Sequence, residues 1–246
     1  MTDDALLPLT EDWDRALVVV AHPDDVEFGA AAAVARWTGQ GKTVVYCMVT
    51  SGEAGIDGLS PDECAPVREA EERESAAIVG VETVEFLGFP DGVVEFGVPL
   101  RAAIAGQIRR HRPDIVITGN FRDTWGGRSP NQADHIAVGR AALHASQDAG
   151  NRWIFREQLV DGLEPWGGVR QVWAAGSPQS THAVDTTDTF DAGVASLTAH
   201  RAYIEGLGWE NFDPAEFLES MSRPTGRRLG VTHAAAFEVF TMTFGE

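Results

Sequence analysis

Four short, almost wholly apolar segments alternate with helix-forming segments along residues 16–146, and this alternation constrains the fold more than any other feature. The apolar segments, rich in valine and isoleucine, predict buried strands at 16–21, 43–51, 83–89 and 114–120. The segments between and after them predict helices over 27–41, 67–80, 98–112 and 133–146. Strands that are apolar on both faces belong to a parallel sheet with helices on both sides. The sequence therefore predicts an α/β fold with a mostly parallel sheet flanked by helices.

The second half of the chain has a less regular pattern. It predicts a helix over 188–207 and strands at 169–176, 181–186 and 235–244. Segments 52–66 and 121–132 are rich in glycine, proline and polar residues and predict loops. The sequence has no internal repeat and no linker long enough to divide it, and its 246 residues suit one sizeable domain. We therefore expect a single domain over 1–246 with an irregular C-terminal part.

Charge and composition exclude several classes of partner. Acidic residues outnumber basic ones by 37 to 19, and the formal charge of −18 disfavours nucleic acid and anionic membranes, which bind patches of Lys and Arg. No apolar run approaches the roughly 18 residues that cross a bilayer, and the acidic N-terminal stretch lacks the pattern of a signal peptide. Cys47 and Cys64 form no metal-binding pair and are expected to be reduced thiols. We expect a cytoplasmic protein whose partner is a small molecule.

His22, Asp24 and Asp25 stand where the first predicted strand ends, in the stretch VVVAHPDDVEFG. In open parallel sheets, ligands bind at the carboxyl ends of the strands. Pro23 and the turn that must follow it bring neighbouring side chains together. One imidazole and one carboxylate are ligands for a divalent metal, and the second carboxylate is then free to take a proton from water. The structural alternative is that one of the two aspartates only caps the following helix.

A catalytic zinc site needs a third protein ligand and an open position for water. The fourth predicted strand is followed by a loop that ends in Asp134 and His135, at the start of a helix. His135 is the natural third ligand, and Asp134 is placed to orient a ligand from behind. Alone, such a pair at a helix start is more often a cap with an exposed histidine. The occurrence of both motifs at strand ends of one sheet favours a metal site.

The motifs occur in the order found in LmbE-like proteins, the relatives of N-acetylglucosaminyl-phosphatidylinositol de-N-acetylase (PIG-L). The chain is similar to this family in AHPDD after the first strand, VTSGEAG after the second, VREAEERESAAIVGV with FLGFPDG, and a later ADHIAVG. The resemblance covers residues 16–145 in order and continues weakly through VDTTDTFDAGVASLTAHR. It implies a Rossmann-like fold and a deacetylase or amidase activity, as in the enzymes of mycothiol and bacillithiol metabolism.

The resemblance also implies roles for individual residues. Asp24 is implied as the general base. Arg68 and Asp91 match positions that shape the substrate pocket in relatives. Without the resemblance, Arg68 would be interpreted as a solvated helix arginine and Asp91, in PDG, as a turn residue. The zinc ligands that the resemblance implies are His22, Asp25 and His135.

One motif departs from the family pattern. Many relatives have HPDH where this chain has QADH, so Gln132 stands in place of a histidine that assists catalysis, and Pro130 stands in place of a tyrosine found in some relatives. An amide donates a hydrogen bond to an oxyanion but supplies no proton. We expect Gln132 to contact the substrate and Asp24 to serve as base and acid in turn. The alternatives are that His182 or His200 supplies the proton, or that activity is slow or lost.

The leading hypothesis is zinc-dependent hydrolysis of an N-acyl group, most simply an acetamide on an amino sugar or sugar conjugate. Zinc would polarise the carbonyl oxygen and acidify water, and an aspartate base contributes about 10²–10⁴-fold. The alternatives are an amidase acting on a thiol conjugate or an antibiotic intermediate, and a non-catalytic sugar-binding protein. A nucleotide-dependent oxidoreductase is disfavoured, because carboxylates stand where a glycine-rich pyrophosphate turn is needed. Trp125 and Trp166 are candidate pocket walls, and a homo-oligomer is expected only by analogy with relatives.

Overall fold

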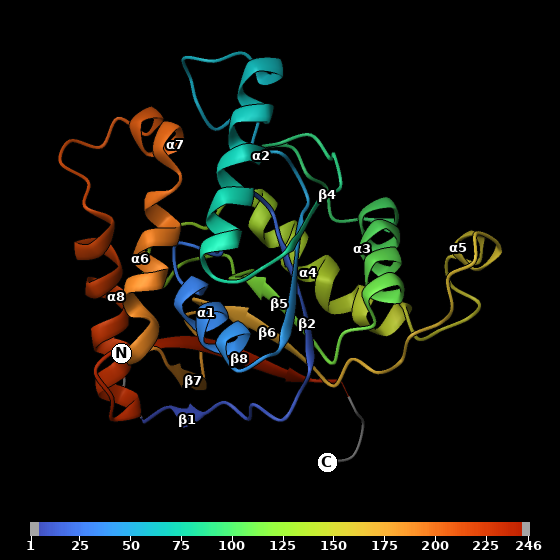
Figure 1. Ribbon diagram of the computed structural model, residues 1–246. Helices are drawn as coiled ribbons and strands as arrows, with labels where there is room; N and C mark the ends of the chain where they lie inside the picture. The colour runs from blue at the N-terminus through green and yellow to red at the C-terminus, as the bar shows by residue number, and fades with distance from the viewer. Residues whose placement is uncertain (1–4, 243–246) are drawn as a thin grey trace.

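An eight-stranded sheet forms the centre of the computed structural model, which describes residues 5–242 (Figure 1). The strands stand in the order β1-β7-β8-β6-β5-β2-β3-β4. All neighbouring pairs are parallel except those that β8 makes with β6 and β7. The prediction of a mostly parallel sheet is therefore confirmed. The strands are β1 (Leu7–Pro8), β2 (Arg15–Val20), β3 (Thr43–Met48), β4 (Thr83–Phe86), β5 (Ile115–Gly119), β6 (Gln171–Ala175), β7 (His182–Asp185) and β8 (Ala234–Thr241).

Helices cover both faces of this sheet, as the sequence predicts (Figure 1). Helices α1 and α2 pack on one face with α6 against α1, and α3 and α4 pack on the other face. The α/β prediction is confirmed in this respect too. The helices are α1 (Ala31–Gly39), α2 (Pro61–Ile78), α3 (Val98–His111), α4 (Ala133–Asp148), α5 (Glu157–Val160), α6 (Phe190–Thr198), α7 (Arg201–Gly206) and α8 (Pro214–Leu229), with a 3-10 turn at Thr187–Thr189.

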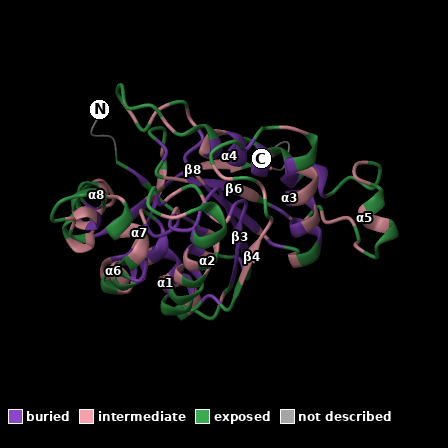
Figure 2. Cartoon of the chain, turned by 90° about the horizontal axis from the view of Figure 1, so that it is seen from above, coloured by how far each residue is buried: buried purple, intermediate pink, exposed green. Residues whose placement is uncertain are grey.

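The central strands alternate their side chains between two apolar cores. On β2, Val18 and Val20 face the α1 side, where Trp37 is buried, while Leu17 and Val19 face the α3 and α4 side. Figure 2 shows the buried layer through the middle of the molecule. Residues 16–20 of β2 are buried on both faces of the sheet, which is why they form an apolar run in the sequence. The first polar residues after it, at 22–25, therefore lie just beyond the carboxyl end of this strand.

The first helix begins later than its composition predicts. Helix α1 starts at Ala31, and residues 21–30 form bends and successive turns, so the prediction of a helix from residue 27 is wrong at its start. The backbone N–H groups of Glu27 and Phe28 both donate to the Asp24 carbonyl, at 2.9 and 3.1 Å. Asp24 itself has φ of 97°, which is uncommon for a residue with a side chain. This backbone conformation delays the helix and creates the corner that carries the two aspartates.

The second helix begins earlier than predicted. Helix α2 starts at Pro61, inside the segment interpreted as a loop over 52–66. Ser60 and Glu63 form a capping box at its start, and Pro61 lies in the first turn, where a missing backbone N–H leaves no hydrogen bond unmade. Cys64 is consequently a buried helix residue, and both Cys47 and Cys64 are free thiols.

The C-terminal part departs most from the sequence prediction. The segment expected as one helix over 188–207 consists of the 3-10 turn, α6 and α7, with a break at Ala199 and His200. Helix α8 is absent from the sequence prediction; it is polar on average, and Leu218 and Gly226 are its buried residues. Strand β8 ends at Thr241, and positions 243 and 244 of the predicted closing strand lie outside the described residues. Among residues 5–242 no helix is long and apolar enough to cross a membrane.

Candidate active site

His22, Asp25 and His135 converge at the carboxyl ends of two neighbouring strands. His22 and Asp25 follow β2, and His135 lies in the first turn of α4, after β5, which pairs with β2. The order of the parallel strands reverses between β2 and β5, which is where open α/β sheets bind ligands. Asp25 Oδ1 lies 3.0 Å from His135 Nε2 and 3.7 Å from His22 Nδ1. The structure thus brings together the three ligands named from the sequence.

Backbone groups fix the carboxylate of this trio. Asp25 Oδ2 accepts the backbone N–H groups of Ala21 and His22, each at 3.0 Å, which leaves Oδ1 for the two imidazoles. Burial raises the pKa of Asp25, but the charges of His135 and His22 outweigh it and hold the pKa well below its usual value. Asp25 is therefore ionised, as a metal-binding carboxylate must be.

Two further carboxylates meet the opposite nitrogen of His22. Asp91 Oδ1 lies 3.0 Å and Asp134 Oδ2 3.4 Å from His22 Nε2. Asp134 is fully buried and accepts the backbone N–H groups of Gly92 at 2.7 Å and Val94 at 3.1 Å, so it also fixes the loop that carries Asp91. Burial lowers the pKa of His22, but the surrounding carboxylates outweigh it and raise the pKa to about 12. Asp134 contacts His22, as expected of a residue that orients a metal ligand. Asp91, which is expected to contact the substrate, lines the cavity and also contacts the His22 imidazole.

Asn131 holds His135 in a similar way. Its Oδ1 lies 3.0 Å from His135 Nδ1, while its Nδ2 donates to the carbonyls of Asn120 at 2.7 Å and Arg122 at 3.0 Å. Each imidazole therefore has one nitrogen held by a protein oxygen and the other turned toward the shared space, as in metal-binding histidines. Sequence reasoning missed Asn131. Asn131 could have been found from its position four residues before His135 at the start of a helix, because side chains four residues apart are neighbours there.

Asp24 lies beside the trio with a buried carboxylate. Arg68 Nη2 is 3.4 Å from Asp24 Oδ2, and the Tyr203 hydroxyl of α7 interacts with the same carboxylate. Burial raises the pKa of Asp24 to about 7, because it outweighs the charge of Arg68. A carboxyl group with a pKa near neutrality both accepts and releases protons at working pH. Tyr203 is absent from the set named from the sequence, because no motif marks it.

Arg68 is part of this buried site and not a solvated helix residue. Its side chain donates to the carbonyls of Gly52, at 3.5 Å, and Pro23, and its guanidinium stacks on the Tyr203 ring at 3.7 Å from the centroid. A Cβ added to Gly55 would lie 2.2 Å from Arg68 Nη1. Glycine in the VTSGEAG segment is therefore required by the close approach of the guanidinium to the backbone.

The site opens into a cavity of about 690 Å³. Gln132 lines it from the start of α4, where its side chain is exposed. Trp125 and Trp209 also line it and are 46% and 52% exposed. Trp166 instead packs in the core on the α3 and α4 side and donates its Nε1–H to the Pro113 carbonyl at 2.8 Å. The interpretation of Trp166 as a pocket wall is therefore wrong, whereas Trp125 is one.

Neither histidine named as an alternative proton donor lines this cavity. His182 begins β7, where its Nδ1 lies 2.8 Å from the Thr181 hydroxyl. His200 is fully buried between Glu27 and Glu72. Burial lowers the pKa of both histidines, that of His200 to about 3, so neither is a cationic acid at neutral pH. The geometry favours neither as the donor.

The residues at the strand ends fit a divalent metal. One ligand atom each from His22, Asp25 and His135 lies within 4.8 Å of the other two. Two imidazoles and one carboxylate form a donor set that catalytic zinc sites use. The other nitrogens of the two imidazoles lie against Asp91 and Asn131, and the nitrogens that face Asp25 share one space with its Oδ1. The surrounding carboxylates add negative charge that favours a cation.

The family model described as GlcNAc-PI de-N-acetylase matches residues 17–146, more than half of the 246 residues. The chain belongs to this family. The matched segment includes both motif-bearing strand ends, and therefore Asp24 with the three converging residues. The GlcNAc-PI de-N-acetylase match ends before β6, so the C-terminal elements that supply Tyr203 and Trp209 lie outside it.

Individual relatives extend the similarity over most of the chain. Diacetylchitobiose deacetylase of Thermococcus kodakarensis is 29% identical over 227 residues, covering 91% of this chain and 82% of that protein. 1D-myo-inositol 2-acetamido-2-deoxy-alpha-D-glucopyranoside deacetylase 2 of Saccharopolyspora erythraea is 28% identical over 183 residues, 64% of each protein. The structure of N,N'-diacetylchitobiose deacetylase from Pyrococcus horikoshii has a TM-score of 0.85 at 24% identity, covering 94% of this chain and 85% of that one. This structural similarity shows that the two proteins share a fold.

Proposed function

We propose that the protein is a metal-dependent deacetylase that removes the acetyl group from an N-acetylated amino sugar or sugar conjugate. The observation that carries this proposal is the convergence of His22, Asp25 and His135 beside the buried Asp24 carboxylate, next to a cavity of about 690 Å³. The relatives named for deacetylation of diacetylchitobiose and of an acetamido-glucopyranoside support the reaction class.

His22, Asp25 and His135 would hold the metal, and their donor set favours Zn²⁺. When bound, the metal supplies a Lewis acid that lowers the pKa of water and polarises the acyl carbonyl. Asp91 and Asp134 keep the His22 ring in its orientation through Nε2, and Asn131 does the same for His135 through Nδ1. Ligand-orienting contacts of this kind typically contribute about 10–100-fold to metal affinity or activity.

Asp24 is the proton-transferring group of the proposed reaction. It takes a proton from the attacking water and returns it to the nitrogen of the departing amine. Arg68 and Tyr203 keep its carboxylate in position, since both contact it from α2 and α7. Gln132, at the cavity wall, donates an amide hydrogen bond to the oxygen on which negative charge develops. A single Asp24 carboxyl thus serves as base and then as acid.

The cavity supports a substrate larger than one sugar ring. Its volume lies in the range of sites that enclose drug-sized ligands, roughly 300–1,000 Å³. Trp125, Trp209, Phe28 and Phe217 line it, and flat aromatic faces pack well against the apolar faces of sugars and of conjugated groups. We therefore place disaccharides and glycosides of N-acetylglucosamine ahead of the free monosaccharide.

The test is a panel of N-acetylated sugars incubated with the zinc-loaded protein and assayed for acetate and free amine. The panel contains N-acetylglucosamine, N,N'-diacetylchitobiose and an N-acetylglucosaminyl inositol. We expect equal amounts of acetate and amine from at least one glycoside, with loss of activity on chelation and recovery on addition of Zn²⁺. A metal-loaded protein that releases acetate from no member, yet binds one of them, would instead support the sugar-binding alternative.

A further inference from the structure

A second cluster of ionisable side chains lies behind the Asp24 backbone, away from the cavity. Glu27 comes from the turns before α1, Glu72 from α2, and His200 from the break between α6 and α7. All three are at most 1% exposed. His200 Nε2 lies 3.7 Å from Glu27 Oε2 and 3.6 Å from Glu72 Oε2, and one ligand atom from each residue lies within 4.8 Å of the other two.

These separations are longer than hydrogen bonds but suit ligands of one ion. Nitrogen–oxygen hydrogen bonds lie at about 2.7–3.2 Å. An ion about 2.0–2.2 Å from each ligand, at the angles of a tetrahedron, spaces the ligand atoms roughly 3.3–3.6 Å apart. His200 Nε2 lies 3.6 Å from Glu72, at the upper end of that interval, and 3.7 Å from Glu27, just beyond it.

The cluster leaves several buried polar atoms without a hydrogen-bond partner. Within the described part of the chain, these atoms are Glu27 Oε2, Glu72 Oε1, both ring nitrogens of His200 and the hydroxyl of Tyr46. Tyr46 lies on β3, and the charges of both glutamates contribute to raising the pKa of its hydroxyl. Such atoms are rare in folded proteins and call for a bound ion or water, because a buried polar group without a partner is destabilising.

One oxygen of each carboxylate already accepts a hydrogen bond, and for Glu72 this is Oε2, the oxygen that lies 3.6 Å from His200 Nε2. Glu27 Oε1 accepts the Ser75 hydroxyl at 2.8 Å, and Glu72 Oε2 accepts the Asp24 backbone N–H at 3.1 Å. Among residues 5–242, His200 is the only basic side chain within 4.0 Å of either glutamate. Burial raises the pKa of both glutamates, and a divalent cation that displaced their protons would offset the charge of the two carboxylates.

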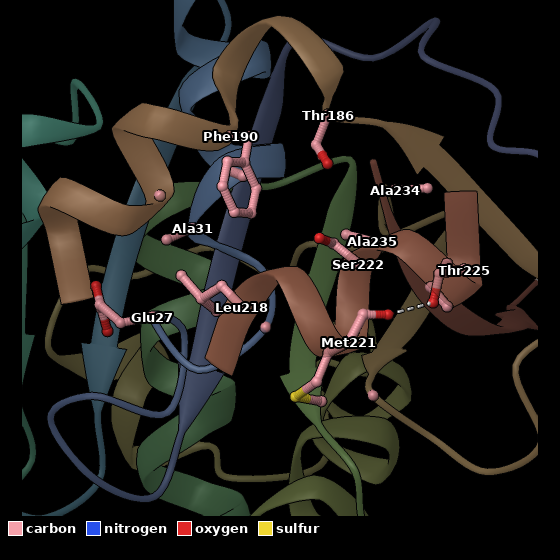
Figure 3. A pocket seen from close by; sticks show the side chains of 15 residues that line it. Glu27, Ala31, Thr186, Phe190, Leu218, Met221, Ser222, Thr225, Ala234 and Ala235 are labelled. Carbon is pink, nitrogen blue, oxygen red and sulfur yellow. Dashed lines mark hydrogen bonds between the residues drawn. The ribbon is translucent and has the colours of Figure 1, made fainter. Parts of the chain in front are cut away.

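A small cavity of about 90 Å³ is lined in part by Glu27 (Figure 3). Phe190 of α6 and Leu218 of α8 border it, as Figure 3 shows. It shares Gly29, Gly176 and Met221 with the large cavity of the active site. Glu27 is the one member of the cluster that lines either of these two cavities.

We propose that Glu27, Glu72 and His200 bind a second divalent cation, of the zinc or manganese class, behind the proposed catalytic base. An imidazole with two carboxylates suits these metals better than Ca²⁺, which takes six to eight oxygens. The ion holds Glu72, which accepts the Asp24 backbone N–H, and so stabilises the turn that carries Asp24. This site shares no ligand with the His22, Asp25 and His135 site, and it stands whether or not the protein is a deacetylase.

The test is the metal content of protein produced in zinc-supplemented medium, measured by mass spectrometry after removal of loosely bound ions. We expect about two ions per chain in the wild type and about one in each of His22→Ala and His200→Ala. Glu72→Gln, which keeps size and packing, should also retain about one, so the result does not rest on His200→Ala alone. His182→Ala removes an imidazole outside both sites and should retain two. Circular dichroism establishes that each variant is folded.

The ion that remains in His22→Ala identifies the second site directly. X-ray absorption should show one nitrogen and mainly oxygen ligands at about 2.0–2.2 Å. A wild type with one ion, lost entirely in His22→Ala and retained in His200→Ala, would overturn the proposal and show that the cluster holds protons. Two ions without any deacetylation would contradict the proposed function and leave this site standing.

Discussion

The Glu72 carboxylate accepts a hydrogen bond from the backbone N–H of Asp24 at 3.1 Å. This contact joins α2 to the turn after β2, where Asp24 has φ of 97°. A buried carboxylate from one helix therefore holds a backbone conformation that a residue with a side chain rarely adopts. The position of the proposed base depends on that contact, in addition to the contacts of its own side chain with Arg68 and Tyr203.

The positive φ of Asp24 predicts an unusual order of stability for two substitutions. Asp24→Gly and Asp24→Ala both remove the carboxylate, but only glycine adopts this φ without strain. We expect Asp24→Gly to be more stable than Asp24→Ala by about 1 kcal/mol or more in denaturant unfolding. At Arg140, an exposed position in α4, the order should reverse, because glycine costs about 0.5–1 kcal/mol in a helix. Equal stability of the two Asp24 variants would show that this φ is not maintained.

Removal of the Tyr203 hydroxyl should shift the pH dependence of catalysis. That hydroxyl hydrogen-bonds to the charged form of Asp24 and lowers the pKa of Asp24. Tyr203→Phe should therefore raise this pKa, and because the base must be ionised, the acidic limb of kcat/KM should move to higher pH. Trp209→Ala, which alters the cavity wall, should leave the acidic limb in place. An unchanged profile in Tyr203→Phe would exclude this contact from the mechanism.

Asn131 should matter for metal binding although it is no ligand. Asn131→Ala removes the acceptor for His135 Nδ1 and should weaken metal binding by about 10–100-fold. Asn131→Asp keeps an acceptor oxygen and should recover much of the affinity. Gln132→Ala, one residue further on, should leave metal affinity unchanged and lower kcat modestly. Competition with a chromogenic chelator measures all three, and wild-type affinity in Asn131→Ala would argue against the orienting role.

Metal affinity should rise with pH. The carboxylates around His22 outweigh the effect of burial and raise the pKa of His22 to about 12 in the metal-free protein, so the ring is cationic at neutral pH. A metal ion must displace a proton from this ring, and protons compete with it more strongly as pH falls. Release of one proton corresponds to about tenfold in affinity per pH unit, between pH 6 and 8. Calorimetry in buffers of different ionisation enthalpy counts the released protons, and a count of zero would be inconsistent with a cationic His22.

The motifs at the strand ends predict the centre of the site, because all parallel sheets place the carboxyl ends of their strands on the same side. His22 and Asp25 follow one strand and His135 the helix after another, and parallel strands end at the same edge. The first strand is recognisable because both of its faces are buried, as at Val18 and Val19. The end of such a strand can be recognised in the sequence, because the first polar residue follows the apolar run there.

The residues that the sequence does not reveal reach the site by tertiary packing. Tyr203 depends on the break at Ala199 and His200 that turns α7 toward Asp24, and helical periodicity continues through that break. Glu72 and Glu27 stand among charged or apolar neighbours that give no sign of complete burial. The positive φ of Asp24 likewise depends on contacts from α2, 48 residues away in the chain.

The most direct measurement is the turnover of Asp24→Asn on a glycoside hydrolysed by the wild type, together with its metal content. Asparagine has nearly the same shape as aspartate but accepts no proton at neutral pH. We predict an unchanged ion count at the His22, Asp25 and His135 site and a fall in kcat of about 10²–10⁴-fold. Wild-type turnover in this variant, with the metal retained, would contradict the assignment of Asp24 as the group that transfers the proton.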